Sequence, residues 1–99
     1  MAQFTGSVND MKSAWFASKG FASNTLNDQM SRYLSANGGG PSNDLNTQWY
    51  TFLSAKGRTG SFTDMMKAEL IASVSGAHSN MSLTDLERKF YGDSTNSFA

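Results

Sequence analysis

Residues 82–92 read Ser82-Leu83-Thr84-Asp85-Leu86-Glu87-Arg88-Lys89-Phe90-Tyr91-Gly92, and this stretch carries a complete helix signal. The hydroxyl of a serine at a helix N-cap accepts a hydrogen bond from the amide three residues later, where Asp85 stands. A carboxylate at that position reaches back to the cap amide and faces the positive end of the helix dipole. Apolar side chains then return at helical spacing until Gly92, a residue type that commonly ends helices. The stretch therefore predicts one short, capped helix.

The same four-residue start (serine or threonine, apolar, asparagine or threonine, aspartate) recurs along the chain at intervals of about 16–21 residues. Full copies occupy 7–10, 25–28, 61–64 and 82–85, and Pro41-Ser42-Asn43-Asp44 matches in its second half. Five of the eight acidic residues hold the last position of this start. We interpret these five residues as helix caps: Asp10, Asp28, Asp44, Asp64 and Asp85.

An apolar stripe and then a glycine follow each start. In 45–53, for example, Leu45, Trp49 and Phe52 recur at the spacing of one helix face. The glycines expected to end the helices are Gly20, Gly38, Gly57, Gly76 and Gly92. Helices of this length are not stable alone in water, so each must bury its apolar stripe against the others.

These features predict an all-α fold with a single domain over residues 1–99, built as a compact bundle of about five short helices. The helical repeats would fill 7–92, and the polar strings 1–6 and 93–99 would form extended N- and C-terminal arms. The run 38–40, three glycines, would be a hinge between the first two helices and the last three. A short helical solenoid is the alternative arrangement of the same repeats.

Composition restricts the partners that the chain could bind. The formal net charge is zero, so the chain lacks the basic field that general binding to nucleic acid or anionic lipid requires. Cysteine is absent, which excludes disulfides and thiolate metal sites. No apolar run approaches the ~20 residues that span a bilayer, and the first residues show no basic-then-apolar signal. We expect no nucleic-acid partner, no membrane partner and synthesis in the cytoplasm.

Catalytic chemistry has few candidate residues. His78 is the one imidazole, and it stands in a link rich in glycine, serine and asparagine with no acidic residue or cysteine near it. The repeated aspartates each stand alone, without a second carboxylate at the spacing of a metal-binding loop. We therefore expect no catalytic residue, no metal and no cofactor, and the protein is predicted not to be an enzyme.

Adjacent aromatic residues provide candidates for partner contacts. Consecutive helix positions lie about 100° apart, so the first ring of a pair can enter the core while the second faces a partner. In the fourth repeat the place of the pair is taken by Glu69-Leu70. The candidate partner-binding residues are the second rings of three pairs and the single rings of the two arms: Phe16, Tyr50, Tyr91, Phe4 and Phe98.

The repeats resemble those of small structural or tail-associated proteins of tailed bacteriophages, which place an aromatic pair and a glycine after [Ser/Thr]-Leu-[Asn/Thr]-Asp-Leu. Residues 82–92 are the closest copy, and Ser42-Asn43-Asp44-Leu45 followed by Trp49-Tyr50 is the next. The resemblance implies a virion component without enzymatic activity, made in the host cytoplasm. It would be a capsid-associated decoration or minor protein, or a tail or connector subunit. Its partners would be a larger capsid or tail protein, copies of itself, or both.

Two other classes of function are compatible with the sequence. A cell-wall or carbohydrate-binding helical module would use Tyr50 and Tyr91 as stacking platforms for sugars. A small regulatory domain that binds nucleic acid is the second alternative, although the zero net charge disfavours it.

Overall fold

The computed structural model describes residues 3–42 and 44–99, and within them the chain forms five helices and no strand. The all-α prediction is thus confirmed. Met1 and Ala2 of the predicted N-terminal arm, and Asn43 of the partial helix start, lie outside the described residues. The helices are α1 (Val8–Ser18), α2 (Leu26–Ala36), α3 (Leu45–Ala55), α4 (Phe62–Ser73) and α5 (Leu83–Tyr91).

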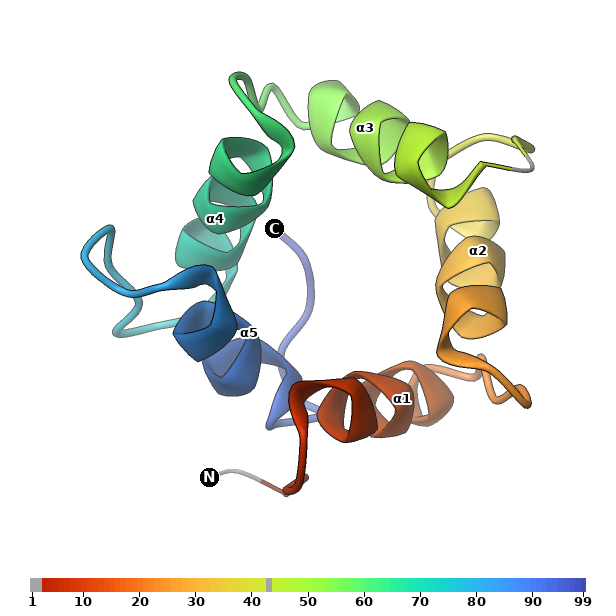
Figure 1. Ribbon diagram of the computed structural model, residues 1–99, viewed down its shortest axis with the longest axis horizontal. Helices are drawn as coiled ribbons and strands as arrows, with labels where there is room; N and C mark the ends of the chain where they lie inside the picture. Colours follow the sequence, from red (N-terminus) through yellow and green to blue (C-terminus); the bar gives the residue numbers. More distant parts are fainter. Residues whose placement is uncertain (1–2, 43) are drawn as a thin grey trace.

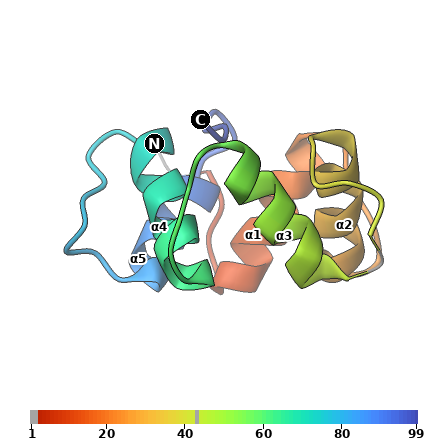
Figure 2. The same ribbon diagram turned by 90° about the horizontal axis from the view of Figure 1, so that it is seen from above.

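The helices follow one another round the rim of a flat disc that measures 33 × 31 × 19 Å (Figures 1 and 2). In the described part of the chain each helix packs only against the helix before it and the helix after it, and α5 packs against α1. Nearest-neighbour packing of this kind is typical of solenoids. The predicted compact bundle is therefore a row of helical repeats that has closed on itself.

Capping boxes start α1 and α4 as the sequence predicts. The hydroxyl of Ser7 accepts from the Asp10 amide (3.1 Å), and the Asp10 carboxylate accepts from the Ser7 amide (3.3 Å). Ser61 and Asp64 repeat the pair at 3.1 and 3.4 Å. The interpretation of these two aspartates as caps is confirmed.

The capping box is complete at the two helices whose N-cap follows a glycine. Gly6 and Gly60 have positive φ, and a Cβ at either would lie 3.0–3.1 Å from the box carboxylate. The N-caps of α2 and α5 do not follow a glycine. There the amides of Asp28 and Asp85 donate to the cap hydroxyl (3.1 Å each), but among the described residues neither carboxylate accepts from the cap amide. The Asp28 carboxylate accepts hydrogen bonds from Ser23 and Arg32, which lower its pKa in that order.

Helix α3 begins later than the partial match predicts. Asp44 is itself the N-cap, and its carboxylate accepts from the Asn46 amide and the Thr47 hydroxyl, both at 3.0 Å. The interpretation of Asp44 as a helix-capping residue is therefore confirmed, although Asp44 is the N-cap itself and not the third-position residue, because a carboxylate is as good an N-cap as a serine. The true helix start is Asp44-Leu45-Asn46-Thr47, which shifts the register of α3 by three residues.

Four of the five predicted glycine stops end a helix. Gly20, Gly38 and Gly57 have positive φ, and the amide after each returns to a helix carbonyl, as in a Schellman motif. Gly92 also ends its helix, but without a positive φ, whereas Gly76 does not end α4. After α4 the chain leaves through Val74 in an extended conformation, and Gly92 is a C-cap in the ordinary right-handed region, with φ −74°.

With the caps aligned, two consecutive positions of every helix point inward. The ninth residue after each N-cap is fully buried in all helices: Phe16, Leu34, Leu53, Leu70 and Tyr91. The eighth residues face the centre of the disc: Trp15, Tyr33, Phe52, Glu69 and Phe90. Two adjacent positions can both be inside because each helix touches a neighbour on either side, which buries a wide arc of its surface.

The first two seams, α1·α2 and α2·α3, repeat one polar contact. Ser13 of α1 donates to the Gln29 side chain of α2 (2.7 Å), whose amide donates back to the Ser13 carbonyl (3.0 Å). Ser31 of α2 and Gln48 of α3 make the same pair at 2.9 and 3.4 Å. Both glutamines are buried, and in both seams the fourth residue after one cap meets the sixth residue after the previous cap.

The seam that closes the disc has the same register. Arg88, the sixth residue after the cap of α5, lies with its Nη1 3.9 Å from the sulfur of Met11, the fourth residue after the cap of α1. An ion pair between Lys12 and Glu87 (2.9 Å) bridges the two helices. Helix α5 thus packs on α1 in the register in which α1 packs on α2.

The glycine run after α2 is packed rather than free. Gly39 is buried, and a Cβ there would lie 2.8 Å from the Cβ of Leu34. The Gly40 carbonyl accepts a hydrogen bond from the Gln48 side chain (3.0 Å). The interpretation of 38–40 as a hinge is therefore wrong, because Gly39, which has no Cβ, packs between Leu34 of α2 and the Gln48 carbonyl of α3.

Replacing Gln48 by alanine should lower the free energy of unfolding by about 2–4 kcal/mol, because it leaves a void in the α2·α3 seam and removes the partner of Ser31. The control is Thr51→Ala, at an exposed position of the same helix, which should change it by less than about 0.5 kcal/mol. Urea unfolding followed by circular dichroism measures both. Equal effects of the two substitutions would contradict a structural role for the seam.

Candidate functional site

The segment that follows α5 turns back over the disc and runs to its centre (Figures 1 and 2). Its turn is made by Asp93, whose carboxylate accepts from the Thr95 amide (2.9 Å) and whose carbonyl accepts from the Asn96 amide (3.2 Å). We call residues 93–99 the tail. The tail is non-helical, as predicted for an arm, but it lies against the body of the protein and does not project from it.

The side chain of Phe98 lies among the inward-facing rings of the disc. Its ring centroid is 4.6 Å from that of Phe90 and 5.4 Å from that of Phe52. Further rings lie 5.5–6.3 Å away, on Trp15, Tyr33, Trp49 and Tyr91. Since these rings come from α1, α2, α3 and α5, one tail residue contacts helices on opposite sides of the disc.

Polar groups of the disc hold the main chain of the tail. The donors are the indole of Trp15 to the Asn96 carbonyl (3.1 Å), the ammonium of Lys19 to the Ser94 carbonyl (2.9 Å), and the ammonium of Lys56 to the Ala99 carbonyl. The Ala99 amide donates to the hydroxyl of Ser73 (3.0 Å). We call Trp15, Tyr33, Phe52 and Phe90, with Lys19 and Lys56, the tail socket.

Glu69 explains the departure of the fourth repeat from the aromatic pattern. Its carboxylate is fully buried, with Arg58 Nε 2.9 Å from one oxygen and Lys56 Nζ 3.7 Å from the other. A buried carboxylate needs such cations, because an unpaired buried charge is strongly destabilising. Glu69 thereby holds Lys56 where its ammonium meets the Ala99 carbonyl.

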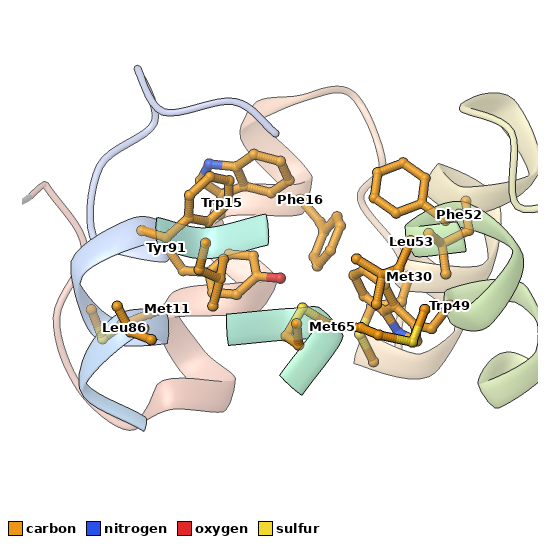
Figure 3. Packing of buried hydrophobic residues seen from close by; sticks show 14 residues of the cluster. Met11, Trp15, Phe16, Met30, Trp49, Phe52, Leu53, Met65, Leu86 and Tyr91 are labelled. Carbon is orange, nitrogen blue, oxygen red and sulfur yellow. The ribbon is translucent and has the colours of Figure 1, made fainter. Parts of the chain in front are cut away.

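Two tyrosines bring hydroxyl groups to the interior. The Tyr91 hydroxyl is buried without a hydrogen-bond partner among the described residues, and Figure 3 shows it pointing away from α5 between Phe16 and Met65. Burial, followed by the charge of Glu87 and by Tyr33, raises the pKa of Tyr91 well above its ordinary value. The pKa of Tyr33 is also raised, by burial first and by the Glu69 carboxylate second.

The candidate partner-binding residues differ in their exposure to solvent. Phe16 and Tyr91 are fully buried, so the prediction that they face a partner is wrong: both lie inside the wide buried arc of their helices. Phe4 and Phe98 are half-buried against the core. Tyr50 is 43% exposed, with its ring 5.5 Å from that of Phe62. Of the two proposed sugar platforms, only Tyr50 is accessible.

The N-terminal segment docks beside the start of the tail. The amides of Gln3 and Phe4 donate to the Gly92 carbonyl (2.6 and 3.1 Å). The side-chain oxygen of Gln3 accepts from the amide of Ser94 (3.1 Å) and from its hydroxyl. The described part of the predicted N-terminal arm is thus joined to the C-terminal tail on the disc.

His78 is exposed in the α4–α5 link. Among residues 3–42 and 44–99 no group of three histidine or acidic side chains could hold a metal ion. None of the helices in the described part of the chain has the length and apolar character needed for a membrane span.

No protein-family model, no curated protein sequence and no solved structure matches this chain. The resemblance of its repeats to those of tailed-phage proteins therefore stays a prediction. The tail socket and the exposed Tyr50 are the structural features from which a function can be inferred.

Replacing Phe98 by alanine should lower the free energy of unfolding by about 2–4 kcal/mol, because Phe98 fills the centre of the disc. Its neighbour Ser97 is exposed, and Ser97→Ala should change stability by less than about 0.5 kcal/mol. Tryptophan fluorescence during urea unfolding is the measurement, since Trp15 and Trp49 both contact Phe98. If Phe98→Ala unfolds at the same urea concentration as the original protein, the tail does not belong to the core.

Replacing Tyr91 by phenylalanine should leave stability at neutral pH unchanged or raise it by up to about 1 kcal/mol, because the hydroxyl is buried without a partner. The raised pKa means that folding favours the neutral phenol. That contribution is complete below the ordinary tyrosine pKa of about 10 and is lost as pH rises above it.

Urea unfolding at neutral and strongly alkaline pH measures this difference. Tyr91→Phe should lose less stability at alkaline pH than the original protein, whereas Tyr50→Phe, at the exposed ring, should lose as much. A loss of stability of Tyr91→Phe at neutral pH would show that the hydroxyl has a partner after all.

Proposed function

We propose that this chain is a non-enzymatic structural accessory subunit of a tailed-phage particle that acts through protein–protein contacts. It would be a capsid-associated decoration or minor protein, or a tail or connector component. The observation that carries the proposal is the seam register shared by α1·α2, α2·α3 and the closing seam α5·α1, which helps to make a small disc from helical repeats. The phage assignment itself comes from the resemblance of the repeats.

The use of side chains supports a structural role. The buried polar residues serve helix packing: Gln29 and Gln48 pair across seams, and Glu69 pairs with Arg58 and Lys56. The carboxylates of Asp10, Asp44 and Asp64 act in helix caps. These buried and capping side chains are thus engaged in building the disc.

The surface supports close packing against other subunits. Zero net charge gives little long-range repulsion between copies. Tyr50 is the large hydrophobic residue exposed in the described part of the chain, and the Phe62 ring beside it extends the apolar surface across the α3·α4 seam. Aromatic residues often dominate interface energetics, so we assign the contact with a larger virion protein to Tyr50.

Particles purified from an infected culture should contain this chain in a fixed ratio to the major capsid or tail protein, as measured by mass spectrometry. Tyr50→Ala should reduce the amount incorporated by roughly tenfold, the loss expected from removing about 1.4 kcal/mol of contact energy. Thr51→Ala, which alters the next exposed position of α3, is the matched control. Absence of the chain from particles would refute the proposal, and equal incorporation of the two variants would refute the contact.

A further inference from the structure

The disc holds its tail in the way that proteins hold peptide ligands. Four of the tail's hydrogen bonds use main-chain groups: the carbonyls of Ser94, Asn96 and Ala99 and the amide of Ala99. Main-chain hydrogen bonds combined with a buried aromatic anchor are a common mode of peptide recognition. The tail socket is therefore a peptide-binding site that is filled by the chain's own residues.

Two side chains of the tail make the recognition specific. The Asn96 amide donates to the Phe90 carbonyl (2.9 Å) and to the Lys89 carbonyl (3.3 Å), at the C-terminal end of α5, where helix carbonyls lack partners within the helix. Phe98 enters the ring of aromatic residues. The socket thus recognises an asparagine followed two residues later by a phenylalanine.

The connection between tail and disc allows the tail to leave. The tail contributes no residue to α5, which ends at Tyr91, and its turn is made by Asp93 within the tail itself. Every copy of the chain carries both the socket and the segment that fits it.

We propose that the tail socket is an interface between copies of this chain, in which residues 93–99 of one copy dock on the disc of another. The inference rests on the proposed function, since it names the segment by which neighbouring subunits are joined. Docking of this kind is head-to-tail, so it forms rings or open rows of subunits. The partner of the site is a second copy, recognised through its Asn-x-Phe tail.

Concentration decides between the two modes of docking. A tail tethered to its own disc has an effective concentration in the millimolar range. Exchange of tails between copies is therefore negligible in dilute solution. It becomes extensive where the concentration of copies reaches the millimolar range, as expected within the proposed particle. The contacts are the same in both modes, so no new surface is needed.

Disulfide trapping tests the exchange, because the chain has no cysteine and the Ala99 amide lies 3.0 Å from the Ser73 hydroxyl. A Ser73→Cys copy is mixed with a size-tagged Ala99→Cys copy at millimolar concentration and oxidised. The mixed disulfide should form in roughly tenfold greater yield than in a control mixture of Ala99→Cys with Ser54→Cys, an exposed position of α3. The Ser73→Cys/Ala99→Cys double variant, oxidised at micromolar concentration, should form the bridge within one molecule.

A capped peptide of residues 92–99 in excess should suppress the mixed disulfide, and the same peptide with Phe98→Ala should not. A yield no higher than the control, or one that the peptide leaves unchanged, overturns the proposal. So does a double variant that fails to close at dilution, because the tail then does not occupy the socket. Exchange in a protein that is absent from particles would overturn only the proposed function, whereas presence in particles without exchange would overturn only this inference.

Discussion

Packing of the Phe98 ring against aromatic side chains of four helices holds the disc together across its centre. Each helix otherwise packs only against its two neighbours in the described residues, so no pair of helices contacts across the ring. Protein interiors are close-packed, and a ring of short helices must fill its middle with something. Here the filling is a segment that lies outside the helical repeats.

Glu69 shows how an exception in a repeat serves the whole structure. At the position where the other helices place Trp15, Tyr33, Phe52 and Phe90, α4 places a carboxylate. The carboxylate draws the cations of Arg58 and Lys56 to the centre, and the second of these meets the end of the tail. The socket therefore holds the tail by a cation near each end, Lys19 at Ser94 and Lys56 at Ala99, and by aromatic rings around Phe98.

Local features were predictable from sequence and distant ones were not. The boxes at Ser7 and Ser61 involve contacts over three residues, so the sequence pattern alone predicts them. The start of α3 was misplaced because residues 41–44 match the second half of the repeated helix start, while serine, asparagine and aspartate are all good N-caps.

Burial of the aromatic residues depends on contacts far along the chain. The exposure predicted for Phe16 and Tyr91 failed because the width of the buried arc is set by neighbouring helices, which the periodicity of one helix does not describe. The position of the tail depends on contacts such as that of Trp15 with Asn96, 81 residues apart. A polar string with one aromatic ring gives no sequence signal of such a contact.

The closing seam has a consequence for the order of folding. The seams of α1 with α2 and of α2 with α3 join residues 16 and 17 apart, whereas the contact of Met11 with Arg88 spans 77 residues. Loop-closure entropy favours the near contacts first. The helices therefore assemble as an open, curved row, and the transition from row to ring comes late, when α5 reaches α1 and the tail can find a complete socket.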